Sequence, residues 1–71
     1  MVLVVEQPRA KPVVLVVEDN EDVRRVVRRY LEANGYQVVE AEDCVAGLAA
    51  FESERPDLIL FDVLLPRLDG I

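Results

Sequence analysis

The stretch that decides the fold is DLILFDVLLP, residues 57–66. Four apolar residues, Leu58–Phe61, run directly into one acid, Asp62, and more apolar residues follow. A short apolar run bounded by Pro56 and Pro66 predicts a strand that is buried on both faces. Burying an unpaired carboxylate is costly, so we expect Asp62 at the carboxyl end of this strand, where solvent and ligands reach it.

Composition limits the protein to one small domain and narrows its partners. The chain has 71 residues, of which 52% are hydrophobic, so it can form a core but is marginal in size. A net charge of −6 argues against nucleic acid or an anionic membrane as the main partner. Four arginines within one predicted helix are interpreted as a solvated face: Arg24, Arg25, Arg28 and Arg29.

Cysteine and histidine usage excludes two kinds of site. Cys44 is the only cysteine and there is no histidine, so an internal disulfide and a Cys/His zinc site are both excluded. No apolar run reaches the ~18 residues of a membrane span. The opening Met1–Val5 lacks the basic region and cleavage site of a signal peptide, so a cytoplasmic location is expected.

Upstream of the opening stretch, a strand and a helix are strongly indicated. Residues 13–18 form a β-branched and leucine run, typical of a buried strand. Asn20 is a suitable N-cap for the helix that follows, and Asn34-Gly35 ends it with a left-handed Gly35. The apolar face of this helix is predicted to contain Val23, Val26, Val27, Tyr30 and Leu31.

A second strand and helix come next. Residues 36–41 predict the strand, and Asp43 the cap of a helix that ends near Arg55, because Pro56 cannot continue it. Gly47 lowers the helix propensity by ~1 kcal/mol relative to alanine. The apolar stripe of this helix is weaker, and is predicted to contain Val45, Leu48, Ala49, and Phe51 or Glu52.

The order strand, helix, strand, helix, strand predicts an α/β fold with a doubly wound parallel sheet. With the first strand in the middle, the strand order is 2-1-3 and the carboxyl ends of the first and third strands meet. Glu18, Asp19 and Asp62 then converge at one rim, where Mg²⁺ would relieve their mutual repulsion. A carboxylate beside such a metal can attack phosphorus and form an acyl phosphate. The alternative to a metal site is that acids occur at this rim only because strand ends are exposed to solvent.

Residues 1–12 are treated as an N-terminal extension, separate from the domain at 13–71. Residues 2–6 repeat the pentapeptide of residues 14–18, Val-Leu-Val-Val-Glu, and a polar segment with two prolines follows. Two interpretations stay open: an accidental β-rich or disordered extension, or an extra strand at a sheet edge, in this chain or a neighbouring one.

Three segments together resemble the receiver domain of two-component response regulators: VLVVEDN at 14–20, NGY at 34–36 and PDLILFDVLLPRLDG at 56–70. The resemblance runs from about residue 13 to the end, in spacing as well as in residue type. It implies a flavodoxin-like fold, here incomplete, and a place in a phosphorelay as a phosphoprotein rather than as an enzyme.

The resemblance also implies a role for each site residue. Asp62 would be the phosphoacceptor, phosphorylated by a sensor histidine kinase or a phosphotransfer protein, and a ligand of the Mg²⁺ cofactor. Asp19 would be the principal Mg²⁺ ligand, and Glu18 would act through a water molecule. The backbone carbonyl of Leu64 would complete the protein's share of the metal shell, and Asp69-Gly70 would turn the chain into a third helix.

The resemblance covers only the first part of a receiver domain, because Ile71 follows soon after the third predicted strand. The Ser/Thr that contacts the phosphoryl group and the Lys that pairs with the phosphorylated aspartate belong to the later part of the family's domain. Neither Lys11 nor Ser53 is placed to replace them, so phosphotransfer is expected to be impaired.

Two further expectations concern partners and function. The outer edge of the third strand is expected to be unpaired, which favours self-association through that edge. The alternative function is a non-catalytic interaction or dimerisation fragment without phosphotransfer. A phosphatase of the haloacid dehalogenase type is disfavoured, because Leu64 stands where that family has its second aspartate.

Overall fold

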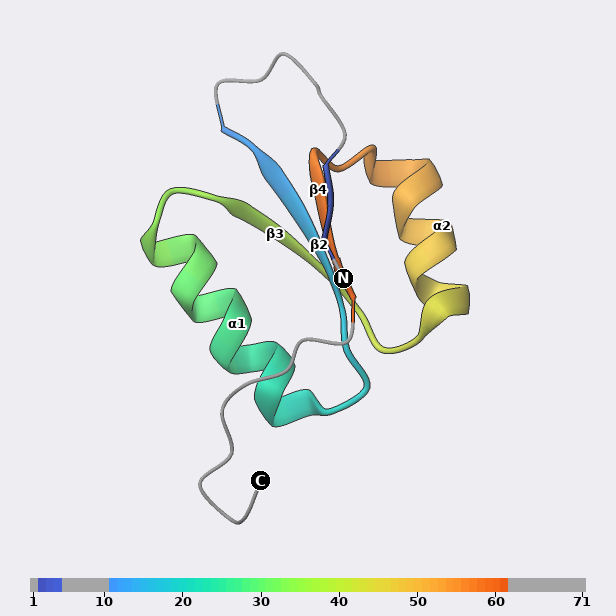
Figure 1. The fold of residues 1–71 in the computed structure, drawn as a ribbon, viewed down its shortest axis with the longest axis horizontal. Helices are drawn as coiled ribbons and strands as arrows, with labels where there is room; N and C mark the ends of the chain where they lie inside the picture. Colours follow the sequence, from blue (N-terminus) through green and yellow to red (C-terminus); the bar gives the residue numbers. More distant parts are fainter. Residues whose placement is uncertain (1, 5–10, 62–71) are drawn as a thin grey trace.

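The computed structural model describes residues 2–4 and 11–61. Its four strands form one sheet, and its two helices cover opposite faces of that sheet (Figure 1). Asp62, Leu64 and the predicted turn at Asp69-Gly70 lie outside the described residues. The elements are β1 (Val2–Val4), β2 (Val13–Val17), α1 (Glu21–Ala33), β3 (Gln37–Ala41), α2 (Cys44–Glu54) and β4 (Leu58–Phe61).

The parallel part of the sheet has the predicted topology. β2 lies in the middle and pairs in parallel with β3, from Val13↔Gln37 to Val17↔Ala41. On its other side β2 pairs in parallel with β4, and Val17 faces Phe61 in that register. The predicted first, second and third strands are β2, β3 and β4 of the structure. Their predicted order 2-1-3 is therefore confirmed, as is the incomplete flavodoxin-like fold.

β1 adds a fourth strand that runs antiparallel along the outer edge of β4. Its register places Val2 opposite Leu60 and Val4 opposite Leu58. The expectation that this edge stays unpaired is thus wrong over the length of β1. Of the two interpretations left open for residues 1–12, the added edge strand is the one that holds for Val2–Val4. The physical reason is that a β-prone segment near the start of the chain pairs with the free backbone groups of β4.

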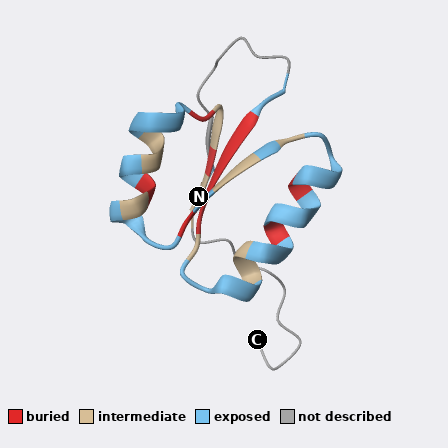
Figure 2. Ribbon diagram, turned by 180° about the vertical axis from the view of Figure 1, so that it is seen from behind, coloured by how far each residue is buried: buried red, intermediate tan, exposed pale blue. Residues whose placement is uncertain are grey.

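The core is built around β2, whose five residues are all buried (Figure 2). Alternate side chains point to opposite faces of a strand, so β2 serves two clusters. Val14 and Val16 pack against Val27 and Leu31 of α1. The other face is built from Leu15, Val17, Ala41 and Ile59, against which Ala46, Ala50 and Phe51 of α2 pack.

Local sequence signals set both helix boundaries as predicted. The Asn20 side chain accepts a hydrogen bond from the Val23 amide, and the Asp43 side chain accepts one from the Ala46 amide. Gly35 has φ = 89°, the left-handed conformation expected after α1. Arg55 adopts φ = 51° just before Pro56, so α2 also ends in a left-handed residue.

The inward face of α2 differs from the prediction. Val45 and Leu48 are exposed, whereas Gly47 is the buried residue of this helix. A Cβ atom at Gly47 would lie 3.0 Å from Val17 Cγ2, so α2 approaches the sheet closely through its small residues. Small residues make the closest approach and Val45 and Leu48 stay exposed, whereas Phe51, one of the predicted positions, is half-buried and packs against the sheet.

Two other burial predictions hold only in part. On α1, Val27 and Leu31 are buried but Val26 and Tyr30 are mainly exposed. In β4 only Ile59 is buried, and the other residues are half-buried, so the expected burial on both faces is wrong. The reason is that α1 and α2 approach β2 and β3 most closely, so the side chains of β4 are covered less completely.

Candidate functional site

The candidate site begins at the carboxyl end of β2. The Glu18 amide donates to the Ala41 carbonyl at 3.0 Å, which extends the β2–β3 pairing by one residue. Glu18 is half-buried, and Asp19, the next residue, is exposed. The strand therefore delivers two consecutive carboxylates to one rim of the sheet, where parallel α/β folds bind their ligands.

The loop between β2 and α1 is ordered by its own hydrogen bonds. The Asn20 amide donates to Glu18 Oε2 at 2.9 Å, and Asn20 Oδ1 accepts from the Val23 amide at 3.0 Å. The Arg24 amide donates to the Asn20 carbonyl at 2.9 Å, which starts the α1 hydrogen-bond pattern. One oxygen of Glu18 is thus occupied within the loop. Asp19 forms no hydrogen bond or ion pair with any described residue.

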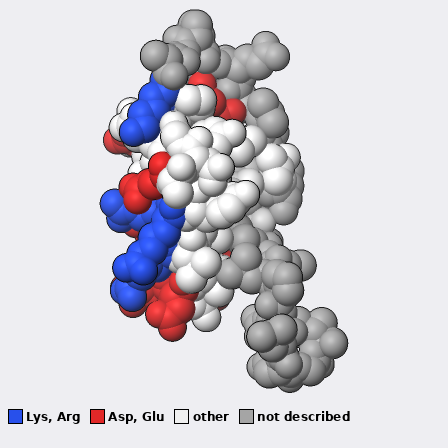
Figure 3. Space-filling view, turned by 90° about the vertical axis from the view of Figure 1, so that its left-hand side faces the viewer, with Lys and Arg blue, Asp and Glu red and all other residues white. Residues whose placement is uncertain are grey.

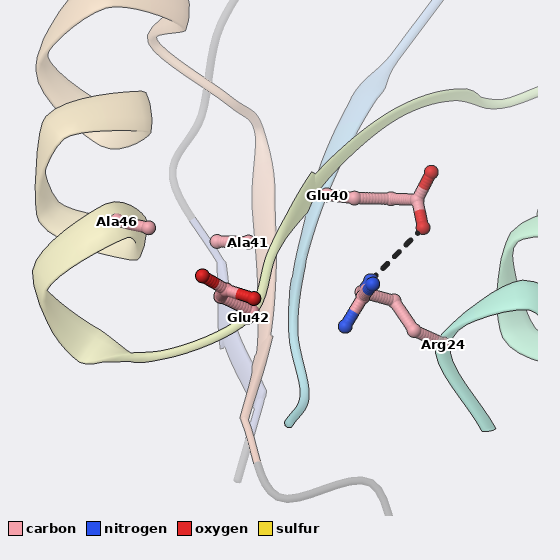
Figure 4. Close-up of a pocket in the computed structure, with 5 residues that line it drawn as sticks. All are labelled: Arg24, Glu40, Ala41, Glu42 and Ala46. Carbon is pink, nitrogen blue, oxygen red and sulfur yellow. Dashed lines mark hydrogen bonds and ion pairs between the residues drawn. The ribbon is translucent and has the colours of Figure 1, made fainter. Parts of the chain in front are cut away.

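Arg24 joins this loop to β3. Its Nη1 donates to the Glu18 carbonyl at 2.8 Å. Its Nε donates to Glu40 Oε1 at 3.1 Å, and this second contact is drawn in Figure 4. These contacts were missed at the sequence level, where Arg24 was interpreted as part of a solvated face. The available signal was its position one turn after the N-cap, which points a long side chain back over the loop.

The remaining contacts of Glu40 come from the next turn of α1. Arg28 Nη1 lies 2.7 Å from Glu40 Oε2, and Arg28 Nε lies 3.2 Å from Glu32. The hydrogen bond to Glu32, followed by the one to Glu40, raises the pKa of Arg28. Figure 3 shows the resulting mixture of basic and acidic side chains along one flank of the molecule. The interpretation of the arginines as a solvated face holds for Arg25, Arg28 and Arg29, which are exposed.

A shallow pocket of about 310 Å³ opens beside this ion pair. Arg24 and Glu40 form one side, and Ala41, Glu42 and Ala46 form the rest (Figure 4). A second pocket of about 370 Å³ lies between α2 and the sheet and is almost entirely apolar. Cys44 lines this second pocket together with Leu15, Gly47, Leu48, Phe51, Ile59 and Phe61.

The structure describes two of the four predicted site residues. Glu18 and Asp19 lie together at the rim, whereas Asp62 and Leu64 fall outside the described residues. β4 is described as far as Phe61, which is the register partner of Val17, the residue before Glu18. Within residues 2–4 and 11–61, no group of three or more His, Cys, Asp or Glu side chains could hold a metal ion.

The two described acids have the chemistry that Mg²⁺ requires. Mg²⁺ binds carboxylate oxygens and keeps several waters, so one or two protein carboxylates are a usual set. Asp19 offers an exposed carboxylate without a described partner, and Glu18 keeps one oxygen free of the described loop hydrogen bonds. These residues fit a hydrated Mg²⁺ ion.

Comparison with known proteins defines the class. Residues 14–71 match the response regulator receiver domain, and this chain belongs to that family. The transcriptional regulatory protein YxdJ of Bacillus subtilis is 47% identical over 57 residues, which are 80% of this chain and 25% of that protein. Response regulator MprA of Mycobacterium avium is 48% identical over 58 residues, which are 82% of this chain and 25% of that protein.

The chain therefore spans about a quarter of the length of the curated relatives that it matches. MprA of Mycobacterium tuberculosis strain H37Rv gives the same identity and coverage as its M. avium counterpart. In the part of the chain that the structure describes, neither helix is long and apolar enough to cross a membrane.

Proposed function

We propose that this chain is the phosphoacceptor part of a two-component phosphorelay, with Asp62 as the residue that receives the phosphoryl group. The main support is the register of the parallel sheet. Val17 pairs with Phe61, and the next residues in the sequence after these two are Glu18 and Asp62. Two adjacent parallel strands that carry acids directly after a matched pair favour one shared rim.

We also assign metal roles to the acids of this rim. Asp19 would be the principal Mg²⁺ ligand, because its carboxylate is exposed and has no described partner. Glu18 would act through water, since Asn20 already uses one of its oxygens. Asp62 and the Leu64 carbonyl would complete the protein ligands. When bound, Mg²⁺ would neutralise negative charge on the carboxylates and the phosphoryl oxygens.

The transfer itself would use a carboxylate oxygen of Asp62 as the nucleophile. This oxygen would form a bond to phosphorus while the bond between phosphorus and the histidine nitrogen of the donor breaks, giving an acyl phosphate on Asp62. The donor would be a sensor histidine kinase or a phosphotransfer protein in the cytoplasm. On this proposal the protein is a phosphorylated signalling module rather than a classical enzyme.

Labelling with acetyl phosphate tests the proposal. The 71-residue chain should take up phosphate only in the presence of Mg²⁺, with a mass gain at Asp62 that Asp62→Asn abolishes. The stoichiometry should be low, because the Ser/Thr and Lys of the family's later motifs are not in this sequence. Asp19→Asn should reduce labelling strongly, whereas Asp22→Asn, which removes an exposed acid from α1, should not. Equal labelling of the Asp62→Asn variant would refute the assignment.

A second candidate function, a non-catalytic interaction fragment, is favoured by one observation. Large apolar side chains are exposed on both helices, at Val26 and Tyr30 of α1 and at Val45 and Leu48 of α2. A fragment that acts only by association should bind its partners equally well after Asp62→Ala, whereas a phosphoacceptor should lose its phosphorylation-dependent binding.

A further inference from the structure

We infer that Arg24 is the positioning residue of the acidic loop. Its guanidinium ties the Glu18 carbonyl to the Glu40 carboxylate, and so fixes the backbone from which Glu18 and Asp19 would meet a divalent cation. This inference rests on the proposed metal site, and it concerns how the acids are held rather than which acids bind.

The first argument is the number of elements that Arg24 connects. The side chain starts on α1, contacts the residue directly after β2 and reaches Glu40 on β3. Among the residues that the structure describes, the loop between β2 and α1 is otherwise held by the hydrogen bond of the Glu18 amide to Ala41 and by hydrogen bonds within the loop and its helix cap. Arg24 therefore supplies the described side-chain contact that anchors the carbonyl side of Glu18 to the rest of the fold.

Burial separates Arg24 from the other arginines of α1. The Arg24 side chain is 15% exposed, against 57% for Arg25 and 48% for Arg28. Arg25 lies 3.8 Å from Glu21 in an exposed i, i+4 pair, which contributes little. A guanidinium with little access to water and with oriented partners forms stronger hydrogen bonds than an exposed one.

Glu40 makes this arrangement compatible with a cation. An uncompensated arginine next to Glu18 would repel Mg²⁺, but Glu40 accepts from Arg24 at 3.1 Å and from Arg28 at 2.7 Å. Arg24 can therefore donate to the loop while Glu40 balances its charge. Glu40 itself is occupied by these two arginines, so it serves as their counter-ion rather than as a metal ligand.

The inference predicts that loss of Arg24 weakens Mg²⁺ binding, whereas simple electrostatics predicts that it strengthens Mg²⁺ binding. Removing a positive charge near acids should strengthen Mg²⁺ binding if only charge matters. If Arg24 holds the loop, Arg24→Gln should instead weaken Mg²⁺ binding by about tenfold, the lower end of losses seen when residues that orient metal ligands are removed. Arg25→Gln removes the same charge from the same helix without touching the loop, so it should leave binding unchanged or slightly tighter.

The experiment combines a metal-free readout with a Mg²⁺ titration, both on the 71-residue chain. Hydrogen exchange of the Asn20 amide, which donates to Glu18, should accelerate about tenfold or more in Arg24→Gln, as expected for the loss of a hydrogen bond from a charged donor. Arg25→Gln should leave this amide unchanged. Arg24→Lys should restore only part of the protection, because a compact ammonium lacks the planar fork through which Arg24 donates to Glu18 and Glu40 from two separate nitrogens.

The outcomes separate this inference from the proposed function. Exchange and Mg²⁺ affinity in Arg24→Gln that match Arg25→Gln would overturn the role of Arg24. A wild-type chain that binds no Mg²⁺ would overturn the proposed metal site, while the exchange rates would still decide whether Arg24 holds the loop. If Arg24→Gln does not fold, Glu40→Ala provides the second test. It keeps the guanidinium but removes the acceptor that anchors it to β3, and unchanged exchange at Asn20 would count against the inference.

Discussion

At the scale of single residues, Asp57 shows how one side chain can fix the start of two strands. Its Oδ2 accepts from the Val13 amide at 2.7 Å, and its own amide donates to the Val13 carbonyl at 2.7 Å. Val13 is almost fully buried, so its amide has little access to water as a substitute partner. This pair lies at the end of the sheet opposite the acidic rim, and therefore serves stability rather than the site.

Asp57→Ala is expected to destabilise the fold by about 1–3 kcal/mol, because it leaves the buried Val13 amide without its acceptor. Asp57→Asn should cost less, since an amide oxygen can still accept this hydrogen bond. Urea unfolding of the two variants measures the difference. An Asp57→Ala variant as stable as the wild type would contradict this role.

At the scale of elements, sequence prediction succeeded where the signal is local. The caps of both helices at Asn20 and Asp43 were predicted correctly, because a cap depends on residues within one turn. The inward face of α2 was predicted only in part: Phe51 packs against the sheet, but Val45 and Leu48 are exposed, because apolar size alone does not decide burial. The contact through Gly47 depends on how close Val17 lies, which no local pattern records.

Gly47→Ala tests this contact. On helix propensity alone the change should stabilise the protein by about 1 kcal/mol. We expect no such gain, because the new Cβ would lie 3.0 Å from Val17 Cγ2 and the stiff valine side chain would have to move.

A double-mutant cycle gives the control for this prediction. In a Val17→Ala background the obstruction is gone, so Gly47→Ala should recover a stabilisation of about 1 kcal/mol. Ala49→Gly, on the exposed side of α2, should cost about the same amount through propensity alone. Urea unfolding measures the change in the free energy of unfolding for each variant. A stabilisation of the full amount by Gly47→Ala in the wild-type background would show that a Cβ at position 47 fits against Val17 without cost, and would contradict the prediction.

At the scale of the whole molecule, the parallel sheet was predictable but its edge was not. The alternation of strands and helices predicts parallel strands joined by crossovers, and with the first strand in the middle the order is that of β3, β2 and β4. β1 shares its residue types with the corresponding part of β2, so composition alone could not decide whether it pairs, or with which strand. Of the candidate site, Glu18 and Asp19 were predicted at the rim, whereas Arg24 was missed because its role depends on the tertiary approach of Glu40.

Removing residues 1–10 should cause the protein to self-associate, because the outer edge of β4 would lose the strand that now covers it. β4 would then expose the backbone groups that β1 now pairs, over Leu58–Leu60. Size-exclusion chromatography with light scattering should show a larger mass for the truncated chain than for the intact chain at equal concentration.

A synthetic peptide of residues 1–10, added in excess, provides the control for this truncation. It should return the truncated chain toward the mass of the intact one by pairing with the free edge. A truncated chain that stays the same size as the intact chain would mean that β1 is not what protects this edge.

The antiparallel placement of β1 has one consequence for any longer protein that contains this segment. A strand offers two hydrogen-bonding sides, and those of β4 are already taken by β2 and β1. Another strand that extends the sheet beyond β4 must displace Val2–Val4. Pairing of β4 with β1 and pairing of β4 with such a strand are therefore mutually exclusive.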